Sequence, residues 1–125
     1  QRVFIAETPL FEITVKDKGK EQTYFAYDEF EKADIFAHRV NTEFVRVVNE
    51  NTLKMRVWER GNGETPACGT GACAAAIAAV LNGHCPMNED ITVKVKGGEL
   101  IVNYTGETVY LTGSAELVYE GIIEI

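Results

Sequence analysis

Cysteine, histidine and tryptophan are scarce in this chain, and basic side chains are outnumbered. The 125 residues include three cysteines, two histidines and one tryptophan, with 12 basic against 19 acidic side chains. An odd cysteine count without the dense spacing of a disulfide framework is typical of a reducing compartment, so we expect a cytoplasmic location. The spacing of the cysteines does not suit a zinc site, so we expect no metal.

Two classes of partner are excluded by the net charge of −7 and its distribution. Nucleic acids and acidic membranes are bound by clustered lysine and arginine that replace counterions on phosphate. Here charges of both signs are dispersed along the chain. No apolar run has the length and flanks of a membrane span, and the first residues, QRVFIAETP, lack the pattern of a signal peptide. We expect neither nucleic acid nor membrane as a partner.

Alternating apolar and polar residues predict strands along most of the chain. Residues 11–15 and 22–27 flank the turn sequence KDKGKE and are expected to form a hairpin. A helix is expected at residues 28–39, with Asp28 as its N-cap. Further strands are expected at residues 2–6, 43–49, 52–59, 90–96, 99–104, 108–113 and 115–121.

The segment GTGACAAAIAAVL, Gly69–Leu81, carries no charge and contains six alanines. A helix that is apolar on every side is expected to be buried on every side. Because strands follow strands without alternating helices, the pattern favours an α+β fold. We predict one domain, residues 1–125, with a mostly antiparallel curved sheet or barrel wrapped around this buried Ala-rich helix.

The start of this helix has the composition of an anion site next to a thiol. Gly69, Thr70 and Gly71 occupy the first turn, where backbone N–H groups lack helical partners and the helix dipole is positive. Cys68 precedes them, and a helix N-terminus stabilises a thiolate placed there. Such a thiolate suits proton transfer beside a bound carboxylate, although a free cysteine is equally often a small buried hydrophobe.

Polar residues next to two predicted strands are further candidates. Glu59 and Arg60 end one strand, and Arg60 has the fork geometry that pairs with a carboxylate. Asn41 precedes another strand. Taken alone, Glu59 and Arg60 are better explained as a solvated strand end, and Asn41 can be explained as a turn or cap residue. Cys73 is expected in the core, and Cys85 lies in a loop.

Two motifs together resemble a known family. RVNTEFV at Arg39–Val45 and VWERGNGETPACGTGACAA at Val57–Ala75 are similar to diaminopimelate epimerase, with the likeness running from Arg39 to the final strands. The resemblance implies a fold of two similar lobes, each with strands around a central helix. It also implies cofactor-independent interconversion of LL- and meso-diaminopimelate on the route to lysine and the bacterial cell wall. In that reaction two cysteines act on opposite faces of the α-carbon.

The resemblance also implies roles for individual residues. Cys68 matches the second catalytic cysteine, and Gly69 and Thr70 match backbone donors to the substrate α-carboxylate. Glu59 and Arg60 match a pair that contacts substrate, with Glu59 also adjusting the thiol. Asn41 matches an asparagine that binds the distal end of the substrate.

The family's other catalytic cysteine, in an Asn- and Gly-rich segment near the N-terminus, has no match here. We therefore expect this chain to be the C-terminal lobe of a two-lobed epimerase, inactive alone, with the N-terminal lobe as its partner and a homodimer as the family's common assembly. Two alternatives remain. One is another cofactor-independent racemase or isomerase of the same fold, such as a proline racemase relative, and the other is a non-catalytic lobe that binds amino-acid carboxylates.

Overall fold

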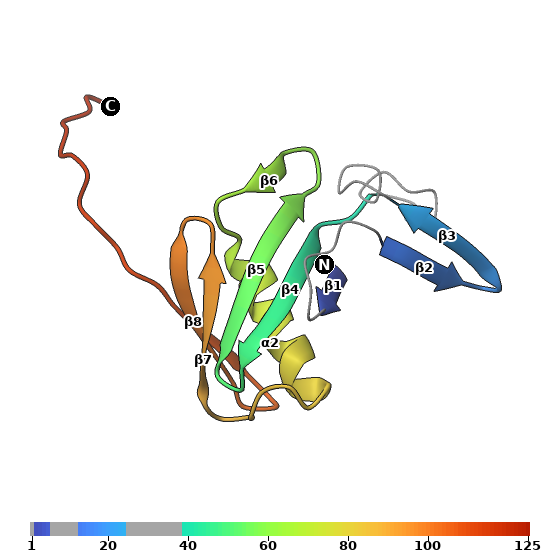
Figure 1. The fold of residues 1–125 in the computed structure, drawn as a ribbon. Helices are drawn as coiled ribbons and strands as arrows, with labels where there is room; N and C mark the ends of the chain where they lie inside the picture. Colours follow the sequence, from blue (N-terminus) through green and yellow to red (C-terminus); the bar gives the residue numbers. More distant parts are fainter. Residues whose placement is uncertain (1, 6–12, 25–38) are drawn as a thin grey trace.

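The computed structural model describes residues 2–5, 13–24 and 39–125, and it is mostly β-structure with one helix in these ranges (Figure 1). The predicted helix at residues 28–39 with its Asp28 cap lies outside them. The strands are β1 (Arg2–Ile5), β2 (Ile13–Asp17), β3 (Lys20–Tyr24), β4 (Thr42–Asn49), β5 (Thr52–Glu59), β6 (Gly63–Thr65), β7 (Asp90–Val95), β8 (Gly98–Tyr104) and β9 (Val109–Thr112). The helix is α2 (Gly69–Leu81), at the bounds that the sequence predicts.

Seven strands form the main sheet, in the order β1-β4-β5-β7-β8-β9 with β6 added beside β5. Pairing is antiparallel except between β1 and β4 and between β5 and β7. The β5–β7 pair is parallel because the chain returns through β6 and α2 before it enters β7, as a parallel pair requires. The fold is therefore α+β with a mixed, mostly antiparallel sheet.

The hairpin of β2 and β3 forms a separate two-stranded sheet. Its turn places Lys18 and Gly19 at positive φ, 46° and 79°. This is the backbone geometry of the two-residue turns that match the twist of antiparallel strands. The hairpin is present as predicted, with its strands shifted by about two residues from the expected bounds.

Helix α2 covers one face of the sheet, which we call the inner face (Figure 1). From α2, four alanines are fully buried with Gly71 along one stripe at spacings of three and four residues. The sheet contributes alternate residues of its strands. The shared core contains Val45, Leu53, Met55, Val57, Ala72, Ala75, Ala76, Ala79, Ile91, Val93 and Val102.

Two features of the predicted architecture differ in the structure. Among the described strands the sheet is open, running from β1 to β9, rather than closed into a barrel. The helix is buried on one side only, and Leu81 at its end is 67 % exposed. The helix lacks charge on every side, yet only its stripe of alanines and Gly71 is buried. The remaining side chains of the helix are half-buried or exposed in this chain.

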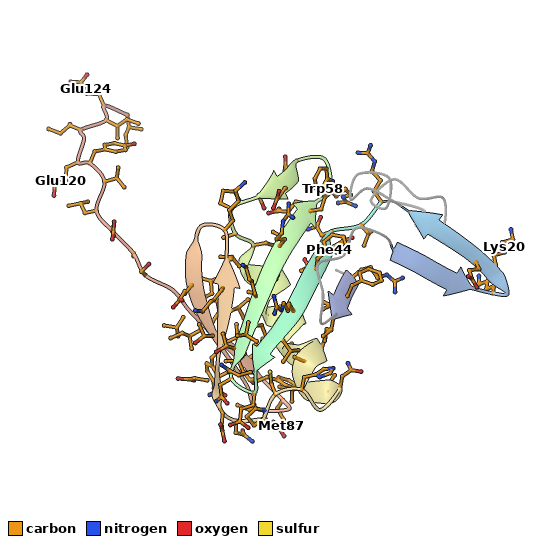
Figure 2. The ribbon with its side chains drawn as sticks, viewed as in Figure 1. Lys20, Phe44, Trp58, Met87, Glu120 and Glu124 are labelled. Carbon is orange, nitrogen blue, oxygen red and sulfur yellow. The ribbon has the colours of Figure 1, made fainter. Side chains whose placement is uncertain are left out.

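The predicted strand at residues 115–121 is absent, and the chain after β9 extends away from the sheet (Figure 1). Glu120 and Glu124 mark this tail in Figure 2. The tail exposes six large apolar side chains: Leu117, Val118, Tyr119, Ile122, Ile123 and Ile125. The tail alternates apolar and polar residues as a strand does, but no described strand pairs with it. A strand needs such pairing to be stable, so the alternation alone does not form one here.

The close fit of α2 on the sheet gives a stability test. Replacing the fully buried Ala76 by leucine adds volume where the helix meets the sheet, and we expect the free energy of unfolding to fall by about 1–3 kcal/mol. Ala78→Leu, on the half-exposed side of the same helix, is the control and should change little. Urea unfolding followed by circular dichroism measures both, and equal losses would contradict the packing described.

Candidate active site

The inner face of the sheet changes from apolar to polar at the end where α2 begins. On β4, Val45 and Glu43 both face inward, and Glu43 lies nearer the start of the strand. Glu43 pairs with Val57 of β5. Val57 in turn pairs with Thr65 of β6. Glu59, two residues after Val57, continues the same face. Register alone therefore gathers carboxyl and hydroxyl groups at the helix start.

Local hydrogen bonds order this polar end. The Thr65 hydroxyl donates to Glu59 Oε1, which fixes the carboxylate against β6. The Arg60 backbone N–H donates to Asn41 Oδ1 at 2.8 Å, which ties the end of β5 to the start of β4. A positive φ of 81° at Gly61 then turns the chain into β6. Glu59 and Asn41 are half-buried, and Arg60 is exposed.

Cys68 is the N-cap of α2. Its backbone is extended, with φ −144° and ψ 111°, and its Sγ accepts from the Gly71 N–H at 3.4 Å. The Thr70 hydroxyl lies 3.5 Å from the same sulfur. The sulfur is thus placed beside the first-turn amides, where the positive end of the helix stabilises negative charge. Cys68 is half-buried and, like Cys73, packs against the core from outside it.

The five other candidates from the two motifs lie at the same end of the fold as Cys68. Gly69 and Thr70 form the first turn of α2, and Thr70 is exposed. A Cβ on Gly69 would lie 3.0 Å from Leu111 Cδ2, so glycine allows β9 to approach the helix start. Glu59 is linked to β6 by Thr65, the third residue before Cys68 in the chain. The arrangement combines a thiol, helix-start amides and a carboxylate.

Glu43 is a polar member of this end that the sequence reasoning missed. Its side chain is 0 % exposed, and burial raises the pKa of its carboxyl to about 7. The Glu43 backbone amide lowers that pKa in part, while the negative charge of Glu59 raises it. The signal was present in TEFV, because Glu43 occupies an inward position of a strand whose neighbours are apolar.

The other two cysteines belong to the packing of the core. Cys73 packs partly buried against it, as expected, and burial followed by the charge of Cys68 raises the pKa of its thiol. Cys85, read from the sequence only as a loop residue, is buried in the core, and burial raises the pKa of its thiol. Raised values disfavour thiolates, so neither residue competes with Cys68 as a base.

No group of three or more metal-binding side chains comes together in the ranges that the structure describes. In the same ranges, no helix is both long and apolar enough to cross a membrane. The groups that the polar end presents, a thiol, a carboxylate and helix-start amides, suit acid–base chemistry and carboxylate binding.

The same architecture occurs in a solved structure. A PhzF-family phenazine biosynthesis protein from Enterococcus faecalis superposes with a TM-score of 0.57 over 87 % of this chain and 35 % of its own, at 18 % identity. At that identity the likeness concerns the fold alone. It defines the class as an α+β fold in which one helix covers a mixed, mostly antiparallel sheet.

The chain belongs to the diaminopimelate epimerase family, whose sequence profile matches residues 8–118. The matched range begins well before Arg39, which is the first residue of the two motifs that resemble the family. The diaminopimelate epimerase of Bacillus subtilis is 55 % identical over 93 residues, 74 % of this chain and 33 % of its own length. That of Bacillus licheniformis is 47 % identical over 121 residues, 86 % of this chain and 42 % of its own. The chain thus spans less than half the length of these relatives.

The raised pKa of Glu43 makes stability depend on pH. The folded state holds the proton up to about pH 7, whereas an unfolded glutamate releases it near its ordinary value of 4.5. The stabilising contribution is therefore complete below pH 4.5 and is lost as pH rises through 7. Relative to the original chain, Glu43→Gln should gain stability over that interval, by about 3 kcal/mol at most.

Urea unfolding at pH 4.5, 6 and 8 measures this difference. Glu64→Gln is a matched control, because Glu64 lies on the outer face in an ion pair with Arg56 at 2.7 Å. The Arg56 hydrogen bond lowers the pKa of Glu64, so its effect has the opposite sign with pH. A stability difference for Glu43→Gln that stays constant across pH would refute the burial argument.

Proposed function

We propose that this chain supplies one half of the active site of a cofactor-independent diaminopimelate epimerase, as the C-terminal lobe of a two-lobed enzyme. The observation that carries the proposal is the position of Cys68: its sulfur caps α2 and lies beside the first-turn amides, within a motif shared with the family. A thiolate at that point faces a natural carboxylate site.

Each site residue has a role in this proposal. The first-turn amides at Gly69 and Thr70 bind the substrate α-carboxylate, and the Cys68 thiolate removes or returns the α-proton on one face. Glu59, fixed by Thr65, and Arg60 bind the amino-acid head. Asn41 holds the end of β5 through the Arg60 amide, and its side chain also contributes to the distal end of the substrate site.

The reaction balances with two sulfurs. The α C–H bond breaks as an S–H bond forms on one face, and on the opposite face a thiol S–H bond breaks as a new C–H bond forms. The configuration inverts and no electron or group is gained. The carbanion charge between the two steps is spread into the α-carboxylate, where helix-start amides stabilise it most in a site that excludes water.

The other half of the site comes from a second lobe in this proposal. The relatives are more than twice as long as their matched part, and Thr70 and Arg60 of this chain are exposed. The apolar tail at residues 115–125 suits a surface that a second lobe covers. A homodimer of the complete enzyme is compatible with this arrangement and follows from the family resemblance alone.

Cys68→Ala in the complete two-lobed protein tests the central role. Loss of the acid–base sulfur is expected to lower kcat by about 10²–10⁴-fold. Cys73→Ala on the same helix is the control and should retain the original rate, because Cys73 does not cap the helix and burial raises the pKa of its thiol. Epimerisation is followed by chiral chromatography of LL- and meso-diaminopimelate, and an undiminished rate in Cys68→Ala removes Cys68 from the mechanism.

The isolated chain should not invert substrate. One sulfur can exchange a proton on one face of the α-carbon, but inversion needs a donor on the other face. Incubation of the chain alone with LL-diaminopimelate in deuterated water is therefore expected to yield no labelled meso product. Mass spectrometry after chiral separation detects it, with the complete enzyme as the positive control. Labelled, inverted product from this chain alone would exclude the half-site interpretation.

A further inference from the structure

Glu43 is a fully buried carboxyl at the floor of the proposed site. In the sheet it stands between Val3 of β1 and Val57 of β5, both apolar. Its exposed fraction is 0 %, which is rare for glutamate outside structural pairs and functional sites. An apolar residue would fill this inward position at lower cost, so the carboxyl calls for an explanation beyond packing.

The carboxyl lies directly against the first turn of α2. A Cβ on Gly71 would come within 2.7 Å of Glu43 Oε1 and 3.1 Å of its Cγ, so only glycine lets the helix rest on this side chain. The Gly71 N–H donates to the sulfur of Cys68. Glu43 and Cys68 are therefore both in contact with one residue, Gly71, at the positive end of the helix.

The ionisable groups around Glu43 come from several elements. β5 contributes Glu59, whose negative charge raises the pKa of the Glu43 carboxyl. The helix contributes the cap Cys68, whose sulfur accepts from the Gly71 N–H, while β1 places the apolar Val3 alongside. Near neutral pH, Glu43 therefore changes its charge beside the negative charge of Glu59.

We propose that Glu43 is a positioning residue of the site: as the neutral acid it supports the helix start, and as the carboxylate it opposes negative charge on the Cys68 sulfur. The catalytic meaning of this inference rests on the proposed function, whereas the electrostatic coupling of the two groups does not. Glu43 does not touch substrate in this scheme. It acts through Gly71 and through the negative charge that it adds to the floor of the site when it loses its proton.

The test is the pH dependence of Cys68 alkylation by iodoacetamide in this chain. Residues 61–94 form one tryptic peptide that contains all three cysteines, and fragment ions in tandem mass spectrometry assign the alkylation to Cys68, Cys73 or Cys85, so no cysteine is replaced. Glu43→Gln removes the charge that opposes the thiolate. We expect the midpoint of Cys68 reactivity to move to lower pH by about half to one unit. Glu99→Gln, an exposed residue paired with Lys94 at 3.5 Å, is the matched control and should leave the midpoint in place.

A purely structural role for Glu43 would leave this midpoint unchanged, so equal midpoints for the original chain and Glu43→Gln overturn the proposal. A shift of the same size in Glu99→Gln also overturns it, because the effect would then be one of net charge. If Glu43→Gln does not fold by circular dichroism, Glu43→Leu keeps the volume without the charge and serves the same comparison.

The complete two-lobed enzyme separates this inference from the proposed function. There we expect the alkaline side of the kcat/KM profile to change in Glu43→Gln while Glu99→Gln follows the original enzyme. A shifted alkylation midpoint in a complete protein that lacks epimerase activity would support the coupling and reject the epimerase. Full activity with unchanged alkylation and pH profiles in Glu43→Gln would support the epimerase and reject the coupling.

Discussion

The close approach of α2 to the sheet is the constraint from which the site follows. Gly71 and four alanines form the buried stripe of the helix, and with side chains this small the helix backbone lies near the strands. The helix start is thereby held over the ends of β4 and β5, where inward positions become polar. Larger residues in the stripe would lift the helix and separate its first-turn amides from these polar groups.

Cys68 caps α2 and is also the proposed acid–base group. The two roles favour different residues. A serine or aspartate would cap α2 better, since sulfur is a weak acceptor and its bond to the Gly71 N–H is long at 3.4 Å. Local stability therefore does not explain the choice of residue. A thiol at this point suits the proton-transfer role proposed for Cys68, which a serine or aspartate cap would not serve.

Much of the fold was predictable from local sequence patterns. The rest depends on contacts between segments that lie far apart in the chain. The bounds of α2 and the hairpin turn at Lys18 and Gly19 were predictable because caps and turns are set by adjacent residues. The parallel pairing of β5 with β7 and the burial of Glu43 depend on which segments meet in space. The tail at residues 115–121 alternates like a strand, yet pairing needs a partner that periodicity does not specify. Of the site, the motifs indicated Cys68, Glu59 and Asn41, while Glu43 required the register of β4.

The proposed division of the site between this chain and a second lobe has a physical basis. Glu43 and the apolar inner face already form a dry floor in this chain, whereas Cys68 is half-buried and Thr70 is exposed. Amides stabilise a developing carbanion best when water is excluded, yet a permanently enclosed site could not admit substrate. A lobe that prebuilds the low-dielectric floor and leaves the opposite wall to a second lobe meets both needs. Covering the site then raises the electrostatic effect of every group at the helix start at once, including the charge that Glu43 carries or lacks.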